Sequence, residues 1–315
     1  MVPAAQGSKL KPEEGAVIPL TCILLPMLLT LGWAQTSPVV TEKITVPWAV
    51  TDWEPYYILE GANAKSGRVD RLRRVLEDHL KGYQFTDMYA DMPKTMELWK
   101  LGKNICSGSA LMTAEREKLA YFSALSFQVP HEYVLVTANT KMVEDLPAEI
   151  SLKDIMKNKK WTGLFVKDRS YGSEIDALVK SVSPRDKHLM LKKNVTEGYT
   201  SLLKMLEKKR FDYMIEYEAV VRAYNEKIFP AKPLATRIVK ESYPSAVFYL
   251  ACTKNPWGRD VVRRADQALQ KMALTSEYQR AVESWLAPDL QKKSRKILDE
   301  FYQKRAQGPW MTAPW

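Results

Sequence analysis

An arginine near the start of a predicted helix is the residue best suited to binding chemistry. Thr113 is a typical N-cap residue, so Arg116 falls in the first turn of the helix that follows it. A cation there opposes the helix dipole by a few tenths of a kcal/mol. A ligand carboxylate would exploit this placement, because a guanidinium makes a two-pronged contact and the helix start adds attraction. The alternative is a surface ion pair between Arg116 and Glu115 or Glu117.

A second candidate is an aromatic loop directly after the predicted strand 44–50. The segment T-D-W-E-P-Y-Y places Trp53, Tyr56 and Tyr57 where a parallel strand ends, and ligands of open α/β sheets usually bind at that edge. The rings could enclose an apolar ligand body while their N–H and O–H groups orient its polar ends. Equally, they could close the end of a hydrophobic core.

The motifs of the common enzyme and metal classes are absent from the sequence. It contains no G-x-G-x-x-G, no P-loop, no H-E-x-x-H and no G-x-S-x-G. Its three histidines are far apart in the chain, and its three cysteines have no C-x-x-C spacing. We therefore predict neither a metal site nor a cofactor.

Composition indicates a globular protein of about two domains. The chain has 315 residues, 46% of them hydrophobic and 27% charged, which excludes a disordered or fibrous chain. The net charge of +10 would suit an anionic partner, but it describes only the surface potential. The basic stretch 291–305 lacks a nucleic-acid-binding motif, so we interpret it as a solvated helix face and predict no nucleic-acid partner.

The N-terminus is typical of an exported protein. Residues 16–34 are uncharged and largely apolar, and Ala34 precedes a plausible cleavage site, so residues 1–34 are predicted to be a signal peptide and the mature protein to be periplasmic. Two prolines and the short apolar length argue against a membrane anchor. In an oxidising compartment Cys106 and Cys252 could form a disulfide, or they could be buried as free thiols.

Strand and helix patterns alternate along the chain, which predicts an α/β fold with largely parallel sheets and helices on both faces. The predicted strands are 44–50, 84–89, 104–107, 132–137, 161–166, 188–191, 211–216 and 246–253. The predicted helices are 69–80, 95–101, 151–156, 173–182 and 198–208, with a mainly helical segment from 258 to about 303.

Several of these segments together resemble a known family. D-W-E-P-Y-Y at 52–57, W-K-L-G-K-N at 99–104 and T-A-E-R-E-K-L-A-Y-F-S at 113–123 resemble the family 3 extracellular solute-binding proteins, which bind amino acids for ABC importers. The Ser-Tyr-Gly turn at 170–172 and the segment 209–217 resemble parts of that family's second lobe.

The resemblance implies a two-lobed fold of the type II periplasmic binding proteins, with a hinge between the lobes and the ligand in the cleft. Lobe 1 would comprise residues 43–128 and 245–305, lobe 2 residues 131–240, and a C-terminal tail residues 306–315. Cys106 and Cys252 would lie on neighbouring strands of lobe 1, which favours the disulfide. The implied ligand-binding residues are Trp53, Tyr56, Tyr57, Ser109, Thr113, Arg116, Ser170, Tyr171, Gly172, Glu216 and Tyr217.

One departure from the family concerns the ligand's ammonium group. Amino-acid binders usually place an Asp five residues after the first Asp of this strand; counted from Asp212, that position is Tyr217, with Glu216 beside it. The ligand is therefore either an amino acid held by Glu216 or a compound that is uncharged or purely anionic.

The sequence thus predicts an exported protein that captures a small carboxylate-bearing solute for transport or sensing. Its partner would be the membrane component of an ABC importer or a receptor. Two alternatives stay open. One is a dehydratase-like periplasmic enzyme on the same fold that uses Glu54 or Glu216 for proton transfer. The other is a stand-alone sensor. We favour a binding protein over an enzyme.

Overall fold

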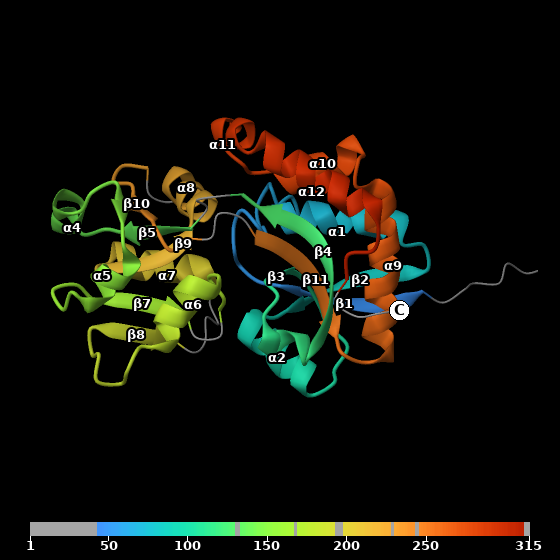
Figure 1. The fold of residues 1–315 in the computed structure, drawn as a ribbon, viewed down its shortest axis with the longest axis horizontal. Coiled ribbons are helices and arrows are strands. Elements are labelled where there is room, and N and C mark those ends of the chain that lie inside the picture. Colours follow the sequence, from blue (N-terminus) through green and yellow to red (C-terminus); the bar gives the residue numbers. More distant parts are fainter. Residues whose placement is uncertain are drawn as a thin grey trace, which may run out of the picture. The chain divides into compact units, whose positions relative to one another are not determined.

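The computed structural model describes residues 43–129, 133–166, 169–192, 198–227, 230–242 and 246–311. The predicted signal peptide over residues 1–34 lies outside these residues. The described chain forms two β-sheets, each flanked by helices (Figure 1). None of the described helices has the length and apolar character that spanning a bilayer requires.

The first sheet has the strand order β2-β1-β3-β11-β4. Its strands are β1 (Ile44–Val50), β2 (Tyr83–Tyr89), β3 (Cys106–Ala110), β4 (Ala120–Gln128) and β11 (Ala246–Thr253). The helices that accompany it are α1 (Arg68–His79), α2 (Met92–Lys100), α3 (Ala114–Glu117), α9 (Pro256–Met272), α10 (Ser276–Glu283), α11 (Pro288–Lys293) and α12 (Arg295–Gln307).

The second sheet has the strand order β6-β10-β5-β9-β7-β8. Its strands are β5 (Tyr133–Thr137), β6 (Glu149–Ile150), β7 (Gly163–Val166), β8 (Leu189–Lys192), β9 (Tyr213–Tyr217) and β10 (Ala235–Val239). Its helices are α4 (Thr140–Asp145), α5 (Leu152–Lys157), α6 (Ser173–Lys180), α7 (Tyr199–Glu207) and α8 (Glu218–Lys227).

Burial on both faces explains why the first sheet is so apolar. Successive strand residues point to opposite faces. Val46 and Trp48 of β1 belong to the core that includes the apolar residues of α1 and α9, whereas Ala49 packs in a second cluster with Met96 and Trp99 of α2. The sheet is therefore held between two layers of helices, and its strand ends are positioned rigidly.

Both sheets are mixed, so the expectation of largely parallel sheets is only half right. Five of the nine described strand pairs are parallel and four are antiparallel. Every antiparallel pair contains β5 or β11. These are the strands with which the chain first enters the second sheet and later returns to the first. The chain reaches these two strands by passing from one sheet to the other and not through a βαβ crossover, so they are free to run antiparallel to their neighbours.

The basic segment near the C-terminus is only partly the solvated face that its composition predicts. Lys292, Lys293 and Lys304 are exposed. Arg305 is instead completely buried, where it forms an ion pair with Asp266 at 2.8 Å and donates to the Ala124 carbonyl at 3.0 Å. These bonds attach α12 to α9 and β4.

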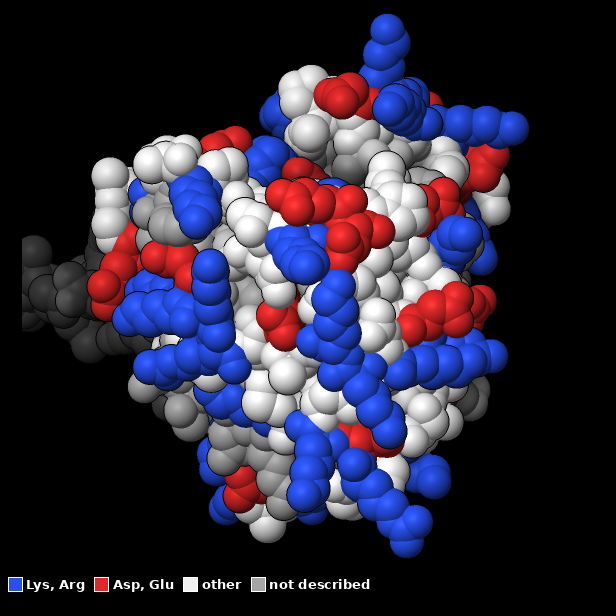
Figure 2. Space-filling view, turned by 90° about the vertical axis from the view of Figure 1, so that its left-hand side faces the viewer, with Lys and Arg blue, Asp and Glu red and all other residues white. Residues whose placement is uncertain are grey.

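Basic side chains are prominent on the face shown in Figure 2, where acidic and uncharged side chains lie between them. A mixture of both signs is typical of a solvated surface, in contrast to the single-sign stripe of a nucleic-acid-binding face.

Candidate ligand-binding site

A cavity of about 50 Å³ lies where strand ends of the two sheets face each other. From the first sheet it is lined by residues that follow or end the parallel strands β1, β2 and β3, such as Thr51, Met92 and Ser109. From the second sheet, Ser170 follows β7 and Tyr217 ends β9. Both sheets thus contribute the carboxyl ends of parallel strands, which is where ligands of α/β sheets bind.

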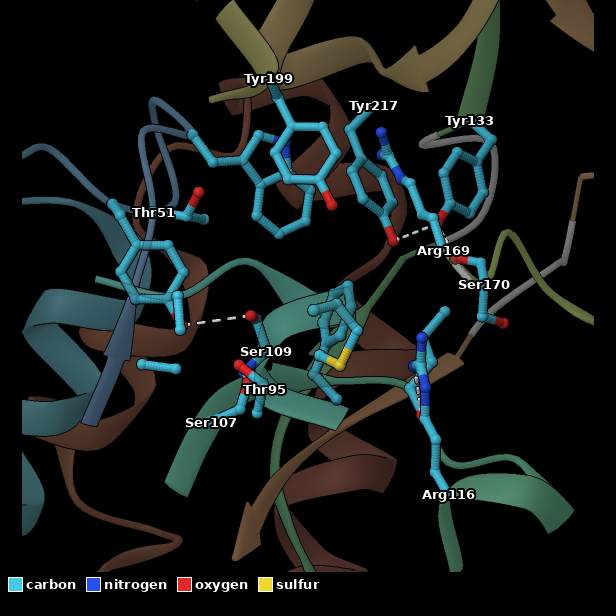
Figure 3. Close-up of a pocket in the computed structure, with 17 residues that line it drawn as sticks. Thr51, Thr95, Ser107, Ser109, Arg116, Tyr133, Arg169, Ser170, Tyr199 and Tyr217 are labelled. Carbon is cyan, nitrogen blue, oxygen red and sulfur yellow. Dashed lines mark hydrogen bonds between the residues drawn. The ribbon is translucent and has the colours of Figure 1, made fainter. Parts of the chain in front are cut away.

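One side of the cavity carries hydroxyl groups from β3 and from α2. Figure 3 shows Thr95, Ser107 and Ser109 together on this side, opposite the tyrosine rings. The Ser109 hydroxyl is 3.1 Å from the Tyr57 hydroxyl, and the two share a hydrogen bond. Such hydroxyls can either donate or accept, so they can orient a polar ligand.

The other side is an aromatic wall. The rings of Tyr133 and Tyr217 stack at 4.1 Å between centroids, and the Tyr133 hydroxyl donates to that of Tyr217 (Figure 3). Tyr199 packs against Trp53 at 5.2 Å. Burial raises the pKa of Tyr199 to about 12 and raises the pKa of Tyr133 and Tyr217 as well. The phenols therefore keep their protons at neutral pH and remain hydrogen-bond donors.

Trp53 brings an unsatisfied donor to this wall. Its side chain lines the cavity and is 7% exposed, and its indole N–H has no hydrogen-bond partner within the described part of the chain. A buried N–H without an acceptor is unfavourable by about 1–3 kcal/mol. A ligand with an acceptor oxygen would remove that penalty.

Arg116 also lines the cavity and is buried, with 4% of its surface exposed. As predicted, Thr113 caps the short helix α3 and accepts a hydrogen bond from the Arg116 N–H at 3.3 Å. The Arg116 side chain donates from Nη1 to the Leu111 carbonyl at 2.8 Å, which fixes its direction. Burial lowers the pKa of this guanidinium, but arginine remains a cation at neutral pH.

A second arginine, which the sequence analysis did not identify, lies beside the cavity. Arg169 donates from Nη1 and Nη2 to the two carboxylate oxygens of Glu216 at 2.7 and 2.6 Å, and both side chains are almost fully buried. Burial alone would lower the pKa of Arg169, but Glu216 outweighs it and holds that pKa well above its ordinary value. A buried two-pronged pair of this kind is rigid.

Six of the eleven predicted ligand-binding residues line the cavity: Trp53, Tyr57, Ser109, Arg116, Ser170 and Tyr217. The cavity is also lined by residues that sequence reasoning missed, among them Thr51, Thr95, Ser107, Tyr133, Arg169, Tyr199 and Phe248. The signal for Arg169 was its place directly before the Ser-Tyr-Gly turn. The others belong to strand and helix ends whose positions depend on the fold.

The remaining five predicted residues lie elsewhere for identifiable reasons. Tyr56 stacks behind Trp53 at 4.4 Å, and Glu216 is occupied by Arg169. Thr113 lines a neighbouring cavity of about 300 Å³, which shares Arg116, Arg169 and Ser170 with the first. The Tyr171 hydroxyl accepts from the Val166 N–H at 3.0 Å, and Gly172 begins α6 with a φ of +96°.

Glu54, the other acid considered for proton transfer, is not among the residues that line either cavity. Its carboxylate accepts from Lys227 at 2.8 Å.

A disulfide lies beside the hydroxyl side of the site. Cys106 of β3 and Cys252 of β11 are directly paired across the two strands and are joined by a disulfide bond. It ties β11 to the strand that presents Ser107 and Ser109, so it supports the geometry of the hydroxyl side.

The sequence matches no protein-family model and no curated protein. Solved structures match in fold. An ancestral arginine-binding protein bound to arginine has a TM-score of 0.57 and 19% identity, over 78% of this chain and 100% of that one. A probable amino-acid ABC transporter extracellular-binding protein from Bacillus subtilis has a TM-score of 0.53 and 17% identity, over 78% and 99%. An ancestral amino acid-binding protein, a precursor of cyclohexadienyl dehydratase, has a TM-score of 0.57 and 14% identity, over 78% and 96%.

At these identities the likeness is one of fold. The chain has the two-lobed α/β fold of the type II periplasmic binding proteins, which confirms the predicted fold class.

Proposed function

We propose that the protein is an exported solute-binding protein that captures a small carboxylate-bearing ligand in the cavity between its two sheets. The observation that carries this proposal is the buried guanidinium of Arg116 at a cavity that is also lined by Ser109 and by Trp53, whose indole N–H is buried and has no partner in the described part of the chain. All three supply N–H or O–H donors, and a carboxylate is the ligand group that accepts from several donors at once.

Capture would proceed by closure of the proposed lobes, residues 43–128 with 245–305 on one side and 131–240 on the other. Contacts between residues of the two proposed lobes support this view. The Tyr199 N–H donates to the Asp52 carbonyl at 2.9 Å, and Lys227 pairs with Glu54 at 2.8 Å. A ligand that bridges the same two surfaces would stabilise the closed state.

The membrane component of an ABC importer, or a separate receptor, would then recognise the closed form. A role in transport or sensing is supported by the structural neighbours, which include an arginine-binding protein and a probable amino-acid ABC transporter extracellular-binding protein.

A thermal-shift screen of the mature protein against amino acids, polyamines and organic acids tests the proposal. Stabilisation follows ligand occupancy, so a carboxylate hit raises the melting temperature of the native protein. Arg116→Ala should abolish that shift, whereas Arg280→Ala, which removes an exposed arginine of α10, should keep it.

Two results would contradict the proposal. The first is an unchanged shift in Arg116→Ala, which would remove Arg116 from the site. The second is chemical conversion of the bound hit, followed by mass spectrometry, which would favour the enzyme alternative.

A further inference from the structure

The guanidinium of Arg169 lies inside a box of aromatic rings. Its carbon Cζ is 4.8 Å from the ring centre of Tyr199, 4.9 Å from Tyr171, 5.4 Å from Trp53 and 5.6 Å from Tyr217. All four distances are within the range of cation–π attraction. The side chain of Arg169 is only 5% exposed, so this attraction acts in a site largely free of water.

The carboxylate of Glu216 completes the box. Both of its oxygens accept from Arg169, and Oε1 also accepts from the Tyr217 N–H at 2.8 Å. Glu216 is fully buried. Aromatic faces around a buried carboxylate form a binding site for an organic cation, and here an arginine of the protein itself occupies it.

Arg169 leaves no room in this box for the ammonium group of a ligand. Both oxygens of Glu216 are already bonded, and the Arg169 guanidinium beside them would repel a second cation. Removing Arg169 from Glu216 to make room would leave a buried charge without its partner, which is strongly unfavourable.

The cavity of about 50 Å³ beside this box favours anions rather than cations. Arg116 and Arg169 both line it, and its described lining contains no Asp or Glu. The hydroxyls of Ser107 and Ser109 add uncharged donors. The Arg169–Glu216 pair is neutral as a whole, so Arg116 gives the cavity lining its positive charge, and the lining favours a ligand that is anionic and rich in acceptors.

We infer that Arg169 determines specificity by occupying the organic-cation position of the site, so that the protein selects small organic acids over the amino acids that carry the same carboxylate. This inference rests on the proposed function and names its ligand class.

Calorimetric titration tests this selectivity with pairs of an organic acid and the amino acid that differs from it by an amino group. The pairs are propionate and alanine, succinate and aspartate, and glutarate and glutamate. In the native protein, the acid of at least one pair should bind at least tenfold more tightly than its amino acid. Equal or tighter binding of the amino acids would overturn the role of Arg169 while leaving the proposed function intact. Binding of no compound in the set would overturn both.

Substitution of Arg169 gives an independent test with methylguanidinium as the probe. Arg169→Met frees the box and the Glu216 carboxylate, so millimolar methylguanidinium should raise the melting temperature of this variant. It should not change the melting temperature of the native protein, in which Arg169 fills the box. It should also not change that of the double variant Arg169→Met/Glu216→Gln, which lacks the carboxylate.

Absence of a shift in folded Arg169→Met would overturn the inference, and so would an equal shift in the native protein. If Arg169→Met is unfolded in buffer, recovery of its cooperative unfolding transition on adding methylguanidinium supports the inference, and failure to recover it overturns it.

Discussion

Trp53 combines two roles at the level of single residues. Its ring packs against Tyr56 and Tyr199 at 4.4 and 5.2 Å, its side chain lines the cavity, and its N–H is a buried donor without a partner among the described residues. The ring contacts belong to the folded protein with or without ligand. The N–H would gain a partner only when a ligand binds, so the two roles can be separated by experiment.

Trp53→Phe keeps an aromatic ring at this position and removes the donor. A hydrogen bond to a charged group contributes about 1.5–3 kcal/mol, so we expect the affinity for the carboxylate ligand to fall by roughly ten- to a hundredfold. Calorimetric titration measures this loss. Trp257→Phe, at a tryptophan of α9 outside the described cavity lining, serves as the control. An affinity of Trp53→Phe equal to that of the control would show that the indole N–H does not contact the ligand.

At the level of elements, the close packing of β3 against β1 positions the hydroxyl side of the site. Gly108 lies between Ser107 and Ser109, and a Cβ atom on Gly108 would be 2.3 Å from Cζ2 of Trp48 and 2.7 Å from Cγ1 of Val69. Only a residue without a side chain permits this approach. The strand therefore presents its two serines to the cavity while its glycine faces the core.

Gly108→Ala should destabilise the protein, because the new methyl group displaces a buried tryptophan ring. We expect the free energy of unfolding to fall by about 1–3 kcal/mol, the usual cost of overpacking a core. Urea denaturation measures it. Gly308→Ala is the matched control, since nothing lies within 4 Å of its Cβ position and its backbone is extended. Equal stabilities of the two variants would contradict this account of β3.

The start of α5 provides a prediction about pH. Glu241 accepts from the N–H groups of Leu152 and Lys153 at 2.9 and 3.1 Å and from the Ser151 hydroxyl at 2.9 Å. Burial acts to raise the pKa of Glu241, but these hydrogen bonds outweigh it and the pKa is lowered from its ordinary 4.5. Folding therefore favours the carboxylate. Its contribution to stability is full above pH 4.5 and is lost as the pH falls through the lowered pKa.

Glu241→Gln removes that contribution at every pH. The difference in unfolding free energy between native protein and variant should be largest near pH 7 and shrink steadily toward pH 3. Urea unfolding at a series of pH values measures it, with the exposed Glu226→Gln as control. A difference that stays constant from pH 7 to pH 3 would contradict the assignment of Glu241 as an ionised cap.

Helices and strands whose ends are marked by polar or turn residues were predictable from sequence. Elements without such marks were missed or shifted. β1 and β11 have the predicted bounds, because apolar runs end there at polar or turn residues. β3 begins two residues later than predicted, since small residues give little β signal. The prediction missed β4, which is buried on both faces and so lacks alternation, and α8, which follows β9 with no residue between.

The site was predictable where one residue carries its own local evidence. Arg116 was found through its N-cap, and Trp53 and Tyr57 through a loop at a strand end. The only local signal for Arg169 was its place before the Ser-Tyr-Gly turn. Its role depends on Glu216, 47 positions away, and on aromatic rings from four separate segments. Such a constellation exists only once the two sheets are assembled.

At the level of the whole molecule, two α/β sheets direct strand ends toward one cavity, and the chemistry of that cavity favours donors over acceptors. Arg116 is contributed by the element after β3, and Arg169 by the segment after β7. The central claim is that Arg116 holds the ligand's carboxylate when the proposed lobes are closed.

The measurement that tests this claim most directly compares a carboxylate with its amide. The tightest-binding organic acid and the analogue in which the contacting carboxylate is a primary amide are titrated calorimetrically into native protein and Arg116→Ala. The native protein should prefer the acid by about 2–5 kcal/mol, as expected for a buried charge pair, and Arg116→Ala should lose this preference. An unchanged preference in Arg116→Ala would contradict the account.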